Sequence, residues 1–242
     1  MTLETERATV EMNGIQQANV MNISNIFSDF GKWDIILILV VSIGGTLSAY
    51  IHHPRWKAFV LLTPLPFTFA TLALGQPINA THMSALIVLL GYTFAVRLLH
   101  QRFRLPIVWA IALSATAYCI IGGLASLIIP RTDTAFLIAA VVVMITAAII
   151  HSAMPNRQES GQQSPLPVWI KVIVVASVIF FITIIKTLLQ GFMTTFPMLG
   201  VVVAYESRNS LYTVCRHIPV AMLGLVPMMT TIFVLQESIG LG

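Results

Sequence analysis

The sequence predicts an all-α polytopic membrane protein with about eight transmembrane helices. Three observations predict this class: 57% of the 242 residues are hydrophobic, only 9% are charged, and the mean hydropathy is +0.89. A typical soluble domain carries about 25% charged residues. The apolar residues also gather in stretches of roughly 20, the length that crosses a bilayer as a helix.

Eight apolar stretches are predicted to cross the membrane. In order, they cover residues 34–52, 58–75, 83–100, 105–129, 133–151, 167–189, 191–206 and 212–236. Residues 1–33 do not have a cationic start followed by an apolar core, so they do not read as a cleavable signal peptide. They are predicted to be an extracytoplasmic tail, in which residues 20–31 form either a weak surface helix or plain flexible chain.

Basic residues predict the orientation, because Lys and Arg concentrate in cytoplasmic loops. Most of them fall in alternate loops: Arg55, Lys57, Arg97, Arg102, Arg104, Arg157, Lys171, Arg208 and Arg216. These loops are assigned to the cytoplasm, which places both termini outside. The predicted location is a bacterial inner (plasma) membrane, crossed several times. The net charge of +4 is explained by these loop residues that set the orientation, so no nucleic-acid partner is expected.

A faint repeat divides the chain. An ungapped offset of 131 residues superposes Pro66 on Pro197 and Thr63 on Thr194. Spans one, two and three then correspond to spans six, seven and eight, so that each pair differs by five crossings, and this odd offset inverts the second copy. The predicted parts are membrane repeat 1 with four spans (34–129), a connecting span with a cytoplasmic linker (130–166), and membrane repeat 2 with three spans (167–242).

The first repeat contains the segment Leu62-Thr-Pro-Leu-Pro-Phe-Thr-Phe-Ala70 and, before span four, the turn Arg102-Phe-Arg-Leu105. In these features it resembles the GlpM-like small bacterial inner-membrane proteins, which have about four spans and a proline-rich second span. Residues 167–236 look like a second, diverged copy that keeps Phe196-Pro197. The resemblance implies a duplicated membrane fold and little defined chemistry.

Two proline-broken segments are the candidate functional feature. Within a bilayer, the carbonyl groups that proline leaves without a donor need protein, water or a ligand as partners. Interrupted helices at matching positions of two inverted halves are typical of a transporter's central site. The predicted substrate-binding residues combine the prolines with nearby hydroxyls and two cations: Thr63, Pro64, Pro66, Thr68, Thr194, Thr195, Pro197, Lys186 and Arg97. The structural alternative is that the hydroxyls repair the helix and the cations reach lipid headgroups.

The sequence therefore predicts a transporter that moves a small anionic or lipid-linked solute through a site between spans two and seven. The alternative is a non-catalytic subunit or scaffold of a larger membrane complex. No carboxylate lies inside a predicted span, and the sequence contains no His-Glu-x-x-His motif and no phosphate-binding glycine loop, so enzymatic activity, a cofactor and a metal are not expected. The expected partners are the lipid bilayer, a small-molecule or lipid-linked solute, and a second copy or a membrane complex.

Overall fold

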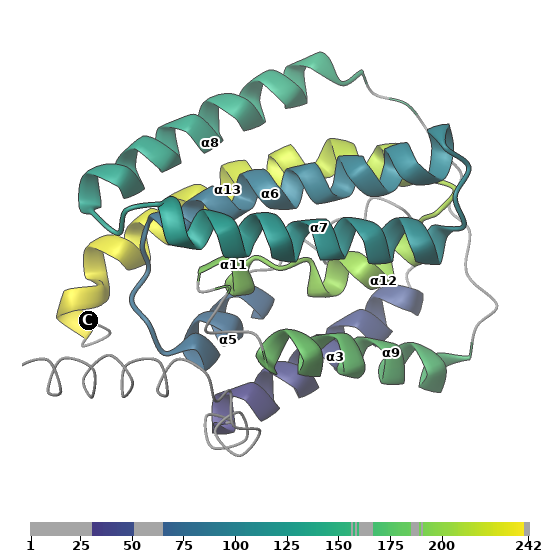
Figure 1. The fold of residues 1–242 in the computed structure, drawn as a ribbon, viewed down its shortest axis with the longest axis horizontal. Helices are drawn as coiled ribbons and strands as arrows, with labels where there is room; N and C mark the ends of the chain where they lie inside the picture. The colour runs from purple at the N-terminus through teal and green to yellow at the C-terminus, as the bar shows by residue number, and fades with distance from the viewer. Residues whose placement is uncertain are drawn as a thin grey trace, which may run out of the picture. The chain divides into compact units, whose positions relative to one another are not determined.

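A computed structural model describes residues 31–50, 65–155, 157, 159, 167–184, 189 and 191–239. These residues form helices and no strands, which confirms the all-α class (Figure 1). In chain order the helices are α3 (Lys32–Tyr50), α5 (Leu65–Leu74), α6 (Ala80–Arg97), the π-helix η1 (Leu98–Arg102), α7 (Ile107–Ile128), α8 (Asp133–Ala153), α9 (Val168–Ile184), α11 (Gly191–Thr194), α12 (Met198–Glu206) and α13 (Leu211–Ile239).

Among the described residues, four helical segments are long and apolar enough to cross a membrane: Ala80–Arg102, Ile107–Ile128, Asp133–Ala153 and Leu211–Gln236. Their outward surface is apolar, and Leu127 and Ile128 at the end of α7 are 75% and 79% exposed. Lipid suits such side chains better than water does. The described part of α5 has ten residues and is about 15 Å long, too short to cross a bilayer by itself. Eight spans and an inverted repeat therefore remain predictions.

Side-chain hydrogen bonds cap the amino-terminal ends of two of these helices. The Asn79 side chain accepts a hydrogen bond from the backbone nitrogen of Thr81 (3.0 Å), and His82 Nδ1 accepts one from the backbone nitrogen of Asn79 (3.2 Å). These bonds close a capping box at the start of α6. Thr132 Oγ1 caps α8 by accepting from the backbone nitrogen of Ala135 (3.3 Å). The caps satisfy amide groups that would otherwise have no partner in the membrane.

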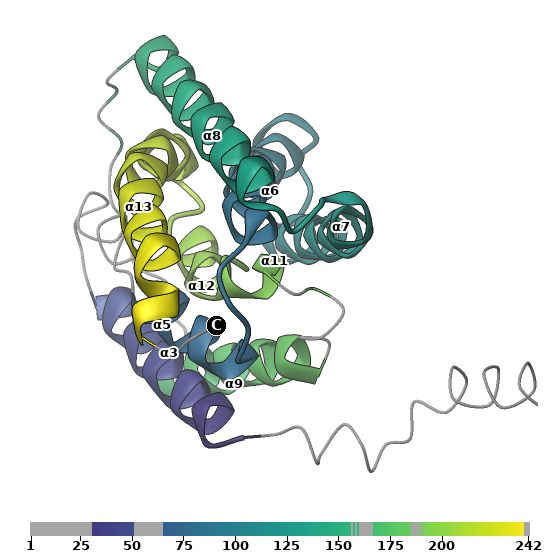
Figure 2. The same ribbon diagram turned by 90° about the vertical axis from the view of Figure 1, so that its left-hand side faces the viewer.

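Two apolar clusters hold the described helices together. In one cluster α8 and α13 pack on α6, with Phe136, Val143 and Met222 fully or almost fully buried. In the other cluster α11 and α12 pack between α6 and α7 on one side and α3 and α9 on the other. Figure 2 shows the two short helices enclosed by these longer ones. The enclosed pair is the part of the fold that positions the candidate site.

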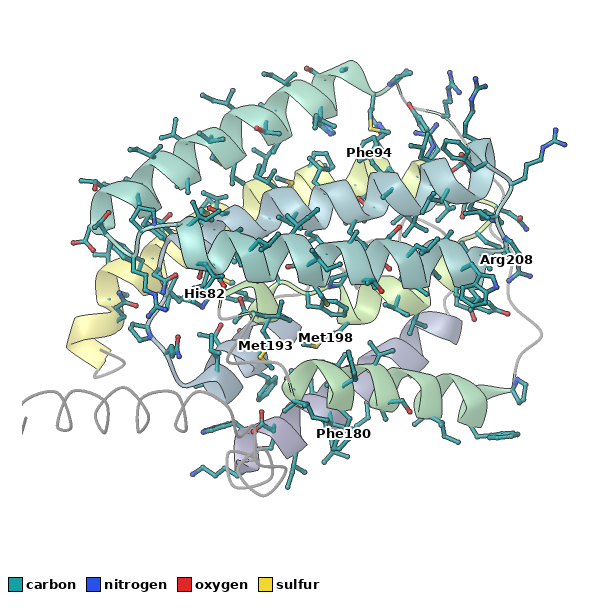
Figure 3. All side chains as sticks on the ribbon, viewed as in Figure 1. His82, Phe94, Phe180, Met193, Met198 and Arg208 are labelled. Atoms are coloured by element: carbon teal, nitrogen blue, oxygen red, sulfur yellow. The ribbon has the colours of Figure 1, made fainter. Side chains whose placement is uncertain are left out.

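Basic side chains from separate segments meet at one end of the group formed by α6, α8 and α13. The guanidinium groups of Arg97 and Arg157 lie 4.7 Å and 5.2 Å from the centroid of the same Tyr212 ring. Arg216 Nε donates to the backbone oxygen of Met154 (3.2 Å), and Arg208 lies at this end too (Figure 3). The cluster joins loops that the charge pattern assigns to the cytoplasm; which side of the membrane it faces remains a prediction.

Candidate functional site

The candidate site is built on the interruption between α11 and α12. Helix α11 ends at Thr194, and α12 begins at Met198 after Pro197. Pro197 has φ −73° and ψ 55°, and the backbone nitrogen of Met198 donates to the oxygen of Phe196 (2.6 Å). These values define an inverse γ-turn. The interruption predicted at Pro197 is therefore present, and its cause is local, because proline has no N–H to continue the helix.

The interrupted segment is buried on all sides. Phe192 and Met193 are fully buried, and Thr194 and Thr195 are 3% and 7% exposed. Burial without hydrogen-bond partners would cost several kcal/mol for each backbone group in a membrane interior. The segment meets this need partly from itself, because Thr194 Oγ1 donates to the oxygen of Gly191 (2.7 Å).

Tyr118 of α7 supplies further bonds to the interrupted segment. Its hydroxyl donates to the backbone oxygen of Phe192 (2.8 Å) and lies 3.0 Å from Thr195 Oγ1. Its ring meets Phe196 edge to face, with centroids 5.3 Å apart, a favoured geometry for an aromatic pair. One side chain on a long helix thus fixes both polar and apolar groups of the break.

Gly191 brings the start of α11 against the start of α6. A Cβ placed on Gly191 would lie 2.5 Å from the backbone nitrogen of His82 and 2.6 Å from its Nδ1. Contacts of that length do not occur at real Cβ atoms, so only glycine permits this approach. The interruption is therefore anchored to the capped amino terminus of α6 at one end and to Tyr118 farther along.

A cavity of about 80 Å³ lies beside the interruption. Five segments line it: α5 through Phe67, α6, the stretch from Thr194 to Met198, α12, and α13. Since a water molecule needs roughly 10–15 Å³ on this measure, the cavity has room for about five to eight waters or one small solute. It is large enough to be a binding site and too small for a lipid chain.

The lining side chains carry no formal charge. They are mostly apolar, and the polar groups among them come from Tyr92, Thr93, Thr194, Thr195 and Cys215. The Thr93 hydroxyl donates to the oxygen of Leu90 (2.8 Å), and the Cys215 thiol donates to the oxygen of Thr93 (3.4 Å). The Tyr92 hydroxyl is buried and has no hydrogen-bond partner among the described residues. A buried phenol of this kind normally has a partner, so Tyr92, which lines the cavity, carries a hydroxyl whose hydrogen bond is not used by any described residue.

The structure brings together three of the residues predicted from the sequence. Thr194, Thr195 and Pro197 line the cavity. Pro66 is the second residue of the described helix α5, where proline is tolerated, and Thr68 on the same helix is exposed. Thr68 is not among the lining residues, and the side chain of Pro66 lies outside the described part of the structure.

Of the remaining predicted residues, Arg97 alone lies in the described part of the structure. Arg97 is not among its lining residues; its guanidinium stacks on Tyr212 and its Nε donates to Gln101 Oε1 (3.0 Å). Thr63, Pro64 and Lys186 lie outside the described residues. No described cation therefore faces the cavity, whereas the sequence reasoning had placed Arg97 there.

Tyr92 and Tyr118 are the functional candidates that sequence reasoning missed. Both sit within long apolar helices, and a phenolic hydroxyl in the middle of a span needs a partner. That need is a signal in the sequence, but it does not say which distant segment supplies the partner. Among the described residues, no group of three or more His, Cys, Asp or Glu side chains is placed to hold a metal ion.

Comparison with known protein families, with curated proteins and with solved structures finds no match to this chain. The GlpM-like resemblance therefore stays a prediction from the sequence.

Proposed function

We propose that this chain is a membrane transport protein and that its solute passes through the cavity beside Pro197. The observation that carries the proposal is a cavity next to an interrupted helix, lined by Tyr92, whose buried hydroxyl has no hydrogen-bond partner among the described residues. Interrupted helices enclosed by longer ones are a common way to expose polar groups to a solute at depth in a membrane. A junction that served only for packing would gain by filling this space.

The lining chemistry favours a small neutral solute that accepts a hydrogen bond. No described charge faces the cavity, so an anion would lose its hydration without gaining a cationic partner. This solute class differs from the anionic or lipid-linked one expected from the sequence. A neutral solute of a few non-hydrogen atoms fits the volume of about 80 Å³.

A non-transporting subunit is the second candidate, and a specific observation favours it. Tyr118 and Gly191 tie the interruption tightly to α7 and α6, which is what a purely structural break requires. The two candidates differ in whether the cavity admits solute.

The experiment is an osmotic assay on the full chain in proteoliposomes. Shrunken vesicles are exposed to urea, formamide, glycerol or acetate, and reswelling is followed by light scattering. We expect a neutral solute to enter faster than into protein-free vesicles, and Tyr92→Phe to slow entry roughly two- to tenfold, the value of one hydrogen bond. Tyr205→Phe is the matched control, since Tyr205 is not a lining residue, and should behave like wild type.

Three results of this assay would count against the proposal. Entry of every solute at the protein-free rate would favour the non-transporting subunit. Acetate as the only permeant would restore the anionic solute expected from the sequence. Equal slowing by Tyr92→Phe and Tyr205→Phe would remove Tyr92 from the site.

A further inference from the structure

A second hollow lies on the outer surface of α6 and η1, apart from the cavity beside Pro197. Its volume is about 670 Å³, and it is lined by Gly91, Phe94, Leu98, Arg97, Gln101 and Arg102, together with one alanine. None of these residues lines the smaller cavity. Figure 3 shows Phe94 on the side of α6 that faces α8, and Phe94 packs against the apolar cluster of α6, α8 and α13.

The hollow has an apolar part and a cationic part, which follow one another along the helix axis. Gly91, Phe94 and Leu98 follow one another at intervals of three and four residues, which places them on one face over about 10 Å. Arg97, Gln101 and Arg102 come at the end of the helix, where the other basic residues gather. The apolar part therefore points toward the middle of the span, and the cationic part lies at its end.

The π-helix η1 shapes the cationic part. The backbone nitrogen of Phe103 donates to the oxygen of Leu98 (3.2 Å), which is the five-residue spacing of a π-turn. The wider turn changes the direction of the side chains after Arg97, so Arg97, Gln101 and Arg102 can face one hollow. Such turns are rare and occur often at functional sites.

The cations of the hollow have no anionic partner in the part of the chain that the structure describes. Among the described residues, no carboxylate is paired with Arg97 or Arg102. The nearby carboxylate of Glu159 instead accepts from the backbone nitrogen and the hydroxyl of Thr213 (2.7 Å and 2.8 Å). Arg157 shares the Tyr212 ring with Arg97, which adds to the positive potential. Neighbouring cations repel one another unless an anion lies between them.

From this division of charge and apolar surface, we propose that the hollow binds one anionic glycerophospholipid. Its phosphate lies between Arg97 and Arg102, and the first part of an acyl chain lies over Leu98, Phe94 and Gly91. Basic pockets beside membrane helices recognise anionic headgroups in this way. Arg97 is already held by Tyr212 and Gln101, so little side-chain freedom is lost when it binds phosphate.

Native mass spectrometry of the full chain in a neutral detergent tests the proposal. Phosphatidylglycerol and phosphatidylcholine with identical chains are titrated separately, and soluble glycerol 3-phosphate serves as the headgroup without chains. We expect phosphatidylglycerol to bind more tightly than the other two. Arg102→Gln should weaken its binding about fivefold and Arg97→Gln/Arg102→Gln about 25-fold, since each basic residue near a membrane surface contributes about a factor of five.

Two matched controls separate the hollow from its surroundings. Arg104→Gln removes a neighbouring exposed charge that does not line the hollow and should keep wild-type affinity. Gly91→Leu adds an apolar side chain at a position where a Cβ has no atom within 4 Å. It should fill the apolar part of the hollow and weaken binding with all charges present. Gly224→Leu adds the same side chain at another open glycine outside the hollow and should have no effect.

Four results would overturn the proposal. The first is equal binding of the two lipids. The second is a loss of lipid affinity in Arg104→Gln as large as the loss in Arg102→Gln. The third is binding of glycerol 3-phosphate as tight as that of the lipid, which would assign the cations to a free phosphate compound. The fourth is unchanged lipid binding by Gly91→Leu, which would show that no acyl chain lies over Gly91.

Discussion

Replacing Gly191 by alanine is expected to destabilise the protein by about 1–3.5 kcal/mol. The added Cβ would lie 2.5 Å from the backbone nitrogen of His82, whereas ordinary contacts begin at 3.4 Å. The Thr81 hydroxyl lies closer still, so one of the two helices must move by about 0.9 Å or more. Overpacking of this kind costs about 1–3 kcal/mol.

The movement also affects the cap of α6. His82 Nδ1 accepts from the backbone nitrogen of Asn79, and a Cβ on Gly191 would lie 2.6 Å from that same ring nitrogen. The loss of one cap adds about 1 kcal/mol, which makes the combined cost about 2–4 kcal/mol before any offset. The intrinsic preference of alanine over glycine in a helix offsets only about 0.5–1 kcal/mol.

The assay is unfolding by sodium dodecyl sulfate in mixed micelles, followed by circular dichroism. Gly91→Ala is the control, because its Cβ has open space and it lies within a helix. We expect Gly91→Ala to leave the free energy of unfolding unchanged or raise it, and Gly191→Ala to lower it. Equal stability of the two variants would refute the close approach of α11 to the start of α6.

Two further predictions concern bonds between distant segments. Tyr118→Phe removes the bonds to Phe192 and Thr195. In the same unfolding assay we expect a loss of about 0.6 to 1.7 kcal/mol, from the average to the maximum found for hydrogen bonds between membrane helices. An unchanged free energy of unfolding would mean that Tyr118 does not hold the interrupted segment. Glu159→Ala removes the carboxylate that accepts hydrogen bonds from Thr213. We expect faster amide hydrogen exchange in the first turn of α13, with a smaller increase for Glu159→Gln. An unchanged exchange rate in Glu159→Ala would exclude Glu159 as a helix cap.

Much of the helical framework can be predicted from local sequence. Apolar stretches of the right length predicted helices α6, α7, α8 and α13 to within a few residues. The shortness of stretch 191–206 and its central Pro197 likewise predicted an interrupted helix, and the structure has one. These features depend on nearest neighbours along the chain, so a single sequence contains the needed information.

Which residues form the site depends on contacts between distant segments, and the hydrophobic pattern of the sequence does not predict such contacts. Tyr118 and Phe192 are 74 residues apart, and the partners of Arg97 include Tyr212 from another helix. An arginine near the end of a span looks the same in the sequence whether it faces a cavity, a lipid or an aromatic ring. The segment around Thr63 and Pro64 lies outside the described residues, so the pairing of the two proline-broken segments stays a prediction.

The most direct test of the central claim is whether water and a small reagent reach Cys215 in the folded protein. Cys215 lines the cavity beside Pro197 and is 1% exposed, and its thiol reacts only as a hydrated thiolate. A Cys119→Ser background leaves it as the single cysteine, so 2-aminoethyl methanethiosulfonate labelling can be read as one added mass in proteoliposomes. A transport cavity that opens predicts labelling of the folded protein, slowed by a permeant solute. Labelling only after unfolding in detergent would contradict the account and leave a closed, structural break.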